Sequence, residues 1–371
     1  MPSPTAPVAL IDLEALADNY RILCERAKPA KVGAAVKANA YGVGLAPVAR
    51  ILFESGCRTF FTAHFEEALT LRTVLPQAII AVLHGLTPPA FGEAIAARIV
   101  PVINTLEALE AWQRCARRRG EALLAFIHLD TGMNRLGLAP PEGEILAAEP
   151  ARLDGITVSA WLSHLACADD AEHPKTTAQL HAFQAILKKL PAAPVSLANS
   201  SGIFRGQDYL FDLVRPGAAL YGINPTPPLP NPMRAVVTLR APILQVRGVD
   251  APMTVGYGAT HVIPKKGRVA TVALGYADGF LRSLGNKGRG KIGDHLVPVI
   301  GRVSMDLVTL DVSALPDGAV YPGSMVEFIG PHYTLDQLAA DAGTIGYEIL
   351  TGLGSRIERV YRFTEPREAR S

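Results

Sequence analysis

Short apolar runs alternate with amphipathic stretches through the first two thirds of the chain. Eight runs have the length and composition of buried β-strands, near residues 32–36, 59–63, 78–83, 99–103, 122–129, 156–163, 194–198 and 211–214. Apolar residues at helical spacing separate most of them, as in 66–75, 106–119 and 176–190. This alternation predicts a parallel (β/α)8 barrel of the TIM type. A doubly wound sheet is the alternative, but it would not ordinarily need eight units, and no G-x-G-x-x-G follows the first strand.

The segments on either side of the predicted barrel differ from it. Residues 8–11 predict a short strand, and Asp12 is a candidate N-cap for a helix with apolar residues at Leu13, Leu16, Tyr20 and Leu23. After the proline-rich segment 225–232, β-rich runs separated by Gly and Pro follow at 235–239, 243–249, 268–274 and 297–300, and only 334–342 and 345–352 look helical. We therefore expect a barrel domain over residues 8–230 and a mostly β domain over 235–371, with the strand at 8–11 packing with the β domain.

Composition narrows the class of protein. Of 371 residues, 49% are apolar and 19% are charged, which is enough apolar side chain for a large core. The 36 basic and 34 acidic residues give a net charge of +2, with no long run of either sign. This balance argues against nucleic acid or an anionic membrane as a partner and favours a small molecule.

The cysteines and the amino-terminal segment indicate the cellular compartment of the protein. The four cysteines, Cys24, Cys57, Cys115 and Cys167, form no C-x-x-C pair, so we expect reduced thiols and no metal site. Residues 1–7 lack the charged and apolar regions of a signal peptide, and no apolar run approaches the ~18 residues of a membrane span. The prediction is a soluble cytoplasmic protein.

Lys37 is the first candidate for chemistry. The small apolar residues 33–36 read as the end of a buried strand, so Lys37 falls at its carboxyl end. Desolvation there would lower the lysine pKa and favour a Schiff base, although a lysine that snorkels to the surface fits the same position. Polar residues also end the fifth to eighth strands, at 130–135, His164, 199–200 and 215–218. Because barrel active sites form at the carboxyl ends of the strands, we expect these groups at one mouth.

The string Val36-Lys-Ala-Asn-Ala-Tyr-Gly42 resembles the pyridoxal-phosphate (PLP) attachment segment of the alanine racemases, the fold-type III PLP enzymes. Further matches extend along nearly the whole chain. They lie at 130–137, 161–169, 199–202, 215–218, 255–259, 275–279, 301–306 and 342–349. The resemblance implies PLP as cofactor, attached to Lys37.

The resemblance also assigns cofactor contacts. It implies that Arg135 bonds the cofactor phenolate near the substrate carboxylate, that His164 stacks on the pyridine ring, and that Arg215 faces the pyridine nitrogen. A permanent cation at that nitrogen weakens the cofactor as an electron sink, which favours reprotonation at Cα, and hence racemisation, over transamination. For Arg215 the alternative is an interdomain salt bridge. The phosphate-side residues implied are Tyr41, Asn199, Ser200, Gly217, Ala218 and Tyr347.

Inversion of a stereocentre is simplest with two bases, one on each face of Cα. Lys37 can serve one face. For the other face the resemblance implies Tyr257, which matches the family's catalytic tyrosine and is expected to reach the site from the second subunit of a homodimer. With an ordinary pKa of about 10, Tyr257 needs cationic neighbours such as His164 and Arg215. The resemblance further implies Tyr276 and Met305 as substrate-pocket residues, supported by Asp306 and Arg282.

Four positions depart from the family pattern. His128 stands where the family often has a lysine, carbamylated in some members to orient the arginine that matches Arg135. Ser304 replaces a frequent cysteine, Gly346 a usual asparagine and Val43 a common histidine.

The function implied is alanine racemisation, the PLP-dependent interconversion of L- and D-alanine, supplying D-alanine for cell-wall peptidoglycan. A racemase that prefers serine or another amino acid is the alternative within this class, because one methylene or hydroxyl is discriminated by only ~1–3 kcal/mol in an apolar pocket. A PLP-binding protein without turnover is the alternative from another class, but such relatives are typically a barrel alone. A decarboxylase of the same fold type would be expected to have a carboxylate in place of Arg215.

Overall fold

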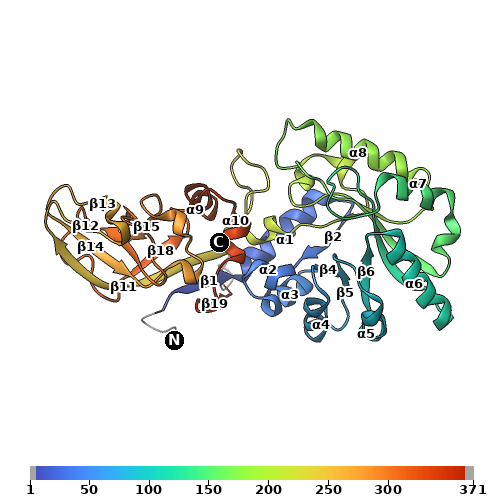
Figure 1. Ribbon diagram of the computed structural model, residues 1–371, viewed down its shortest axis with the longest axis horizontal. Coiled ribbons are helices and arrows are strands. Elements are labelled where there is room, and N and C mark those ends of the chain that lie inside the picture. The colour runs from blue at the N-terminus through green and yellow to red at the C-terminus, as the bar shows by residue number, and fades with distance from the viewer. Residues whose placement is uncertain (1–5, 364–371) are drawn as a thin grey trace, which may run out of the picture.

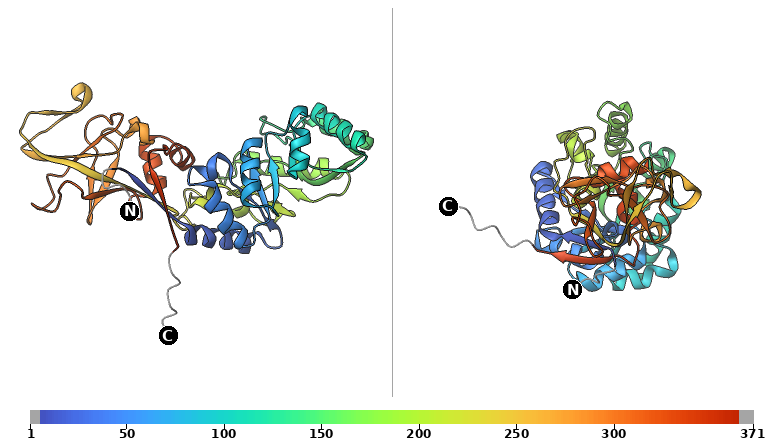
Figure 2. Two further views of the ribbon diagram at one scale, coloured as in Figure 1. Left: turned by 90° about the horizontal axis from the view of Figure 1, so that it is seen from below. Right: turned by 90° about the vertical axis from the view of Figure 1, so that its left-hand side faces the viewer.

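The computed structural model describes residues 6–363, which form an elongated molecule with two bodies (Figures 1 and 2). The first is a barrel of strands and helices, and the second is mostly β-sheet. Residues 1–5 of the amino-terminal segment and residues 364–371 of the expected β domain lie outside the described residues. Within residues 6–363, no helix has both the length and the apolar character needed to cross a membrane.

The predicted parallel barrel is confirmed. Seven parallel strands follow one another in the order of the chain, and β2 with β10 forms the seam that closes the ring. Across this seam the backbone N–H groups of Gly33 and Ala35 donate to the carbonyls of Val214 and Pro216, each at 2.9 Å. The strands are β2 (Lys31–Val32), β3 (Ala34–Ala35), β4 (Thr59–Thr62), β5 (Ile79–Val82), β6 (Ile99–Ile103), β7 (Leu123–His128), β8 (Ile156–Leu162), β9 (Val195–Ser196) and β10 (Leu213–Val214).

Helices surround the barrel, and N-cap side chains fix where two of them begin. Asp12 caps α1 by accepting from the N–H of Ala15 at 2.8 Å, and Thr105 caps α6 by accepting from Ala108 at 3.1 Å. The helices of this body are α1 (Leu13–Ala27), α2 (Lys37–Tyr41), α3 (Leu45–Glu54), α4 (Phe65–Val74), α5 (Phe91–Ala96), α6 (Leu106–Arg119), α7 (Pro140–Ala148) and α8 (Pro174–Leu187).

The second body contains a large, mainly antiparallel sheet. Strand β1 (Val8–Asp12) belongs to it, because it pairs antiparallel with β11 and parallel with β19. Other elements are β11 (Val237–Val249), β12 (Thr254–Val255), β13 (His261–Val262), β14 (Gly267–Val272), β15 (Arg289–Ile292), β16 (His295–Pro298), β17 (Val308–Asp311), β18 (Met325–Ile329), β19 (Glu358–Arg362), α9 (Leu335–Ala342) and α10 (Gly346–Thr351).

One expectation about this sheet is wrong. The runs 235–239 and 243–249 are not separate strands but parts of one strand, β11, that passes through Pro242. The register is irregular between Leu239 and Arg240 and again between Ile243 and Gln245, and the strand changes its main partner from β18 to β14 in this region. The carbonyl of Pro242 still accepts from Ala273 at 3.0 Å. A proline that lacks an N–H is tolerated where the ladder is already irregular.

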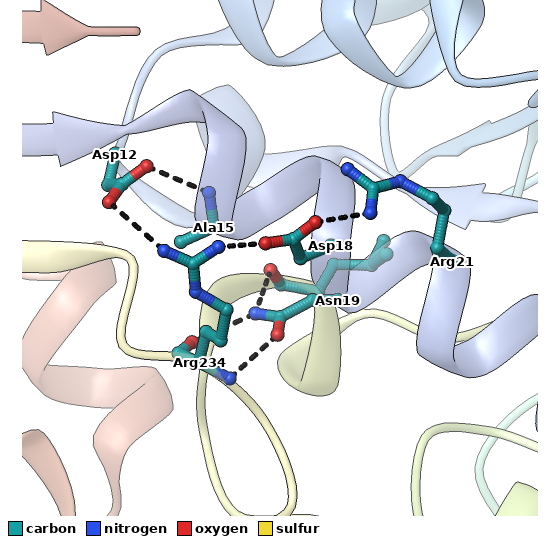
Figure 3. Close-up of polar contacts among 7 residues, drawn as sticks. Asp12, Ala15, Asp18, Asn19, Arg21 and Arg234 are labelled. Carbon is teal, nitrogen blue, oxygen red and sulfur yellow. Dashed lines mark hydrogen bonds and ion pairs between the residues drawn. The ribbon is translucent and has the colours of Figure 1, made fainter. Parts of the chain in front are cut away.

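The linker between the bodies is fixed to α1 (Figure 3). Asn19 is fully buried, and its amide donates to the carbonyls of Leu220 and Arg234 while its Oδ1 accepts from the Arg234 N–H at 2.7 Å. The Arg234 guanidinium pairs with Asp18 and lies 3.9 Å from a carboxylate oxygen of Asp12. These contacts hold the start of the β domain against the barrel.

Candidate active site

A cavity of about 700 Å³ lies at the carboxyl ends of the barrel strands. Ten side chains or glycines predicted from sequence line it: Lys37, Tyr41, Arg135, His164, Asn199, Ser200, Arg215, Gly217, Ala218 and Tyr347. Residues far apart in the sequence meet here because every parallel strand ends at the same rim.

Lys37 follows β3 and opens a left-handed turn. The next four residues, Ala38 to Tyr41, have φ between 53° and 55°, the left-handed region that is unfavourable for residues with a Cβ, by roughly 1–2 kcal/mol each. The turn is stabilised from outside. Asn39 Oδ1 accepts from the Leu45 N–H at 2.8 Å, and Gly42 packs so tightly on the Leu350 carbonyl that a Cβ there would lie 2.2 Å from the oxygen. Helix α10 of the second body thus rests on the lysine turn, between the two bodies (Figure 1).

The environment of Lys37 favours a neutral amine. Burial lowers the pKa of Lys37, and the nearby Arg135 cation lowers it further, while the Glu67 carboxylate opposes them. A lysine with a lowered pKa is a better nucleophile and base near neutral pH than an exposed one.

Arg215 is a buried cation. Its Nη1 donates to Ser196 Oγ and its Nη2 to the Ser163 carbonyl, both at 2.5 Å. Among the ion pairs of residues 6–363, none involves Arg215. Burial lowers the pKa of Arg215 to about 10, which leaves the guanidinium charged at neutral pH. An interdomain salt bridge, the alternative considered from sequence, is therefore absent from the described residues.

Two histidines beside Arg215 are held neutral. Burial lowers the pKa of His164 well below its ordinary value, and the cations of Arg215 and Arg135 lower it further. Arg215 Nη2 lies 3.4 Å from His164 Nδ1, which must be the unprotonated nitrogen because arginine only donates. Burial, with Arg215, also lowers the pKa of His128 to about 4. The cavity therefore contains neutral rings next to permanent cations. The expectation that His164 is a cationic neighbour for Tyr257 is wrong, because burial and the arginines keep its ring neutral.

The loop that carries Arg135 is rigidly built. Asp130 accepts from the backbone N–H groups of Gly132, Met133 and Asn134 at 2.8–2.9 Å. The Leu138 N–H closes the base of the loop by donating to the His128 carbonyl at 2.7 Å. Arg135 is thus presented at the rim of the cavity from a fixed backbone.

The other wall of the cavity is a cradle of main chain and tyrosines. Ser200 Oγ accepts from the N–H groups of Gly217 and Ala219 at 3.0 and 3.1 Å. The Tyr41 hydroxyl rests on Gly217, where a Cβ would lie 2.2 Å from it. Tyr347 approaches from α10, with its ring centroid 6.1 Å from that of Tyr41. Hydroxyls and backbone close to a glycine suit a phosphate.

Three predicted residues form a second group on the β domain. Tyr257, Tyr276 and Met305 are exposed by 74%, 43% and 54% and do not line the cavity. Backbone hydrogen bonds join the last two segments, since the N–H of Tyr276 donates to Ser304 and that of Ala277 to Met305. Tyr257 begins the short helix Tyr257–Ala259 between β12 and β13. These two strands lie at the end of the β domain away from the barrel (Figure 1).

Asp306 and Arg282, the two residues expected to support the substrate pocket, differ in their contacts. Asp306 accepts from Arg356 Nη1 at 2.8 Å, and Arg356 Nε donates to the buried Asp278 at 2.9 Å, so Asp306 is tied to the turn that carries Tyr276. Arg282 is exposed in the short helix Arg282–Leu284 and does not line the cavity.

Sequence reasoning missed several residues of the site. Glu67 contacts the lysine turn, His84 lines the cavity, and Asn104 bonds His128. Each lies in or beside an ordinary strand end or helix start, so only the expectation that all strand ends meet at one mouth could have marked them.

The residues present fit PLP. A desolvated lysine can hold an aldehyde, a small-residue cradle beside tyrosine hydroxyls can hold a phosphate, and the volume lies within the range of ligand pockets. Arg215 is charged, has no acidic partner among residues 6–363, and lines the cavity, so its guanidinium can donate to an electron-rich ring atom. Fold and site together define a barrel enzyme of the PLP-dependent class.

Comparison with known proteins is decisive on the family. Residues 11–225 match the family model described as alanine racemase, N-terminal domain, and residues 236–361 match the one described as alanine racemase, C-terminal domain. The chain belongs to the alanine racemase family. The expected resemblance, enzyme class and cofactor are thereby confirmed.

Individual relatives agree over nearly the full length. The chain is 49% identical over 352 residues to the catabolic alanine racemase of Agrobacterium fabrum, covering 95% of this chain and 91% of that protein. It is 46% identical to the alanine racemase of Rhodospirillum rubrum, covering 95% and 94%. The crystal structure of alanine racemase from Bartonella henselae with covalently bound pyridoxal phosphate has a TM-score of 0.93 at 42% identity, covering 96% of this chain and 100% of that one.

Proposed function

We propose that this chain interconverts L- and D-alanine with PLP by two-base proton transfer. PLP, when bound, supplies an electron sink that acidifies the Cα–H of the amino acid. The observation that carries the proposal is Arg215, a buried arginine in the cavity with no carboxylate partner among residues 6–363. A permanent cation keeps the electron sink weak, which favours return of the proton to Cα. A decarboxylase of this fold type would be expected to present a carboxylate there.

Each base has a distinct position in this proposal. The Lys37 amine exchanges a proton with one face of Cα, and the Tyr257 hydroxyl exchanges a proton with the other. One base removes the proton from Cα and the other delivers a proton to the opposite face, so Cα again carries one hydrogen. Arg135, at the rim of the cavity, holds the substrate carboxylate, with Tyr276 and Met305 completing the pocket.

A homodimer follows from the place of Tyr257. It follows β12, which lies at the end of the β domain away from the barrel (Figure 1), and it does not line the cavity of its own chain. In this proposal a second copy therefore brings it to the barrel mouth. Exposed apolar side chains belong to the segments that flank it, with Met253 just before β12 and Val262 in β13 each more than half exposed. Such a patch is typical of an interface. We expect a head-to-tail dimer with two shared sites, measurable by analytical ultracentrifugation.

The substrate test is circular dichroism of L-alanine incubated with the PLP-loaded protein. We expect the signal to decay to zero as D-alanine forms. Other amino acids, beginning with serine, are tested next. If one of these racemises while L-alanine persists, the chain is still an amino-acid racemase but prefers another substrate. If none of the panel racemises, the chain is a PLP-binding protein without turnover. The presence of the β domain and Tyr257 argues against that outcome.

We also propose that the D-alanine supplies cell-wall peptidoglycan and that the enzyme acts in the cytoplasm. All four cysteines are free in the structure, which is compatible with a reducing compartment. The relative from Agrobacterium fabrum is described as catabolic, so a growth test is needed. Deletion of the coding sequence should create a requirement for D-alanine, whereas a catabolic enzyme would instead be required for growth on alanine.

A further inference from the structure

The strained turn after Lys37 is held by a side chain with no role in the proposed chemistry. Glu67 lies in the first turn of α4, 29 residues from Ala38 in sequence. Its Oε1 accepts from the Ala38 N–H at 2.6 Å, directly after Lys37. Its Oε2 accepts from the N–H groups of Ala63 and His64 at 2.9 and 3.2 Å. One carboxylate therefore ties the end of β4 and the start of α4 to the lysine turn.

The hydrogen bond from Ala38 to Glu67 lies where the backbone conformation is least favourable. Ala38 is the first of the four left-handed residues, and its N–H is donated out of the turn rather than within it. Strained backbone at a site persists only when its surroundings over-determine it. Without Glu67, the amide after Lys37 loses its carboxylate acceptor, and the direction of the lysine side chain is no longer fixed from this side.

Glu67 is also a charge in the surroundings of Lys37. Four charged or titratable groups surround Lys37 from four elements. They are Glu67 of α4, His84 after β5, Arg135 of the loop after β7 and His164 after β8. The carboxylate is the one anion among them. Burial and Arg135 lower the Lys37 pKa, and Glu67 raises it.

We propose that Glu67 is a positioning residue for Lys37, which fixes the left-handed turn through the Ala38 N–H and balances the cations around the amine. The inference rests on the proposed function, in which Lys37 is both the attachment lysine and a base. Its two effects are separable in part. A glutamine loses the charge but can keep one acceptor oxygen for the Ala38 N–H, with its NH2 group then facing the Ala63 and His64 N–H groups, whereas an alanine loses the charge and both acceptors.

The test compares Glu67→Gln and Glu67→Ala with Glu66→Gln as the matched control. Glu66 lies in the same helical turn, so this variant removes an equal charge from α4. In the full chain freed of cofactor, competitive acylation with acetic anhydride, read by mass spectrometry of the Lys37 peptide, gives the pH midpoint of the amine. In the PLP-loaded enzyme, kcat and KM for alanine are measured against pH.

We expect Glu67→Gln to move the Lys37 midpoint to lower pH while keeping kcat at the optimum within about threefold of wild type. We expect Glu67→Ala to lower kcat by about tenfold or more with little change in KM, because misplacing a reacting group costs rate. Glu66→Gln should match wild type. If Glu66→Gln shifts the midpoint as much as Glu67→Gln, or if both Glu67 variants leave midpoint and kcat unchanged, the proposal is wrong.

Failure of the proposed function would look different. A wild-type chain that racemises nothing would still show the midpoint shift in Glu67→Gln if Glu67 acts on Lys37. Should Glu67→Ala fail to fold, the midpoint in Glu67→Gln decides the matter alone.

Discussion

His128 Nδ1 lies 2.9 Å from Asn104 Oδ1. The amide orientation of Asn104 is fixed, because its Nδ2 donates to the carbonyls of Leu83 at 3.0 Å and Val102 at 3.2 Å. Oδ1 can only accept, so His128 must carry its proton on Nδ1. In the neutral ring, Nε2 is then a free acceptor in a cavity lined by Arg135 and Arg215. His128 therefore provides an acceptor in the cavity.

The first prediction concerns this tautomer. Long-range ¹H–¹⁵N NMR of the chain should show His128 as the Nδ1–H form at pH 7, with no protonation down to about pH 5, because its pKa is about 4. Asn104→Leu removes the acceptor and should release the ring to populate both tautomers. A protonated His128 at pH 7, or an unchanged tautomer in Asn104→Leu, would contradict this assignment.

A second prediction concerns stability in acid. The folded-state pKa of His128, about 4, is below the unfolded value of about 6.5. Above pH 6.5 neither state binds the proton, so there is no penalty; as pH falls from 6.5 to 4, only the unfolded state is protonated and stability decreases. At pH 5 the loss from His128 should be about 2 kcal/mol. Urea unfolding at pH 7 and pH 5 gives the change in the free energy of unfolding between the two pH values. In His128→Gln this change should be smaller than in the wild type by about this amount. An unchanged difference would place the acid sensitivity elsewhere.

A third prediction tests the cation at the bottom of the cavity. Arg215→Glu should reduce racemisation by at least about 100-fold and allow transamination to compete, since a carboxylate would strengthen the electron sink. This side reaction transfers the amino group to the cofactor, so it should release up to one equivalent of pyruvate per site, measured with a coupled dehydrogenase. Arg215→Lys is the control: it keeps the charge but not both hydrogen bonds to Ser196 and Ser163, so activity should fall without pyruvate. Pyruvate from both variants would show that charge is not the cause.

The sequence was sufficient for the strands that place the site. Apolar runs marked the barrel strands, and polar residues after the first and the fifth to eighth runs marked their carboxyl ends, which is why Lys37 and Arg215 were expected at one mouth. The left-handed turn was not predictable. Ala38 and Ala40 are good helix formers, and their conformation is imposed by contacts with α4 and α10 from distant parts of the chain.

The elements of the β domain were harder to predict from the sequence for the same reason. Strand β19 carries Glu358, Arg359 and Arg362 and was not expected, because its pairing with β1 joins the two ends of the chain. Pro242 read as a break, yet tertiary pairing carries β11 through it. Where the partner strand is distant in sequence, local pattern is a weak guide.

The last prediction separates the two proposed bases. Tyr257→Phe removes only a hydroxyl, on a residue 74% exposed and remote from the cavity of its own chain, so PLP binding and folding should be unchanged. Racemisation should fall by about 100- to 10,000-fold, the usual contribution of a general acid or base. Lys37 still exchanges the proton on its own face of Cα, so in D₂O one alanine enantiomer should gain deuterium at Cα much faster than the other, measured by NMR and chiral chromatography. Equal loss of exchange from both enantiomers would contradict the division of roles, because it would place Tyr257 in a step common to both faces.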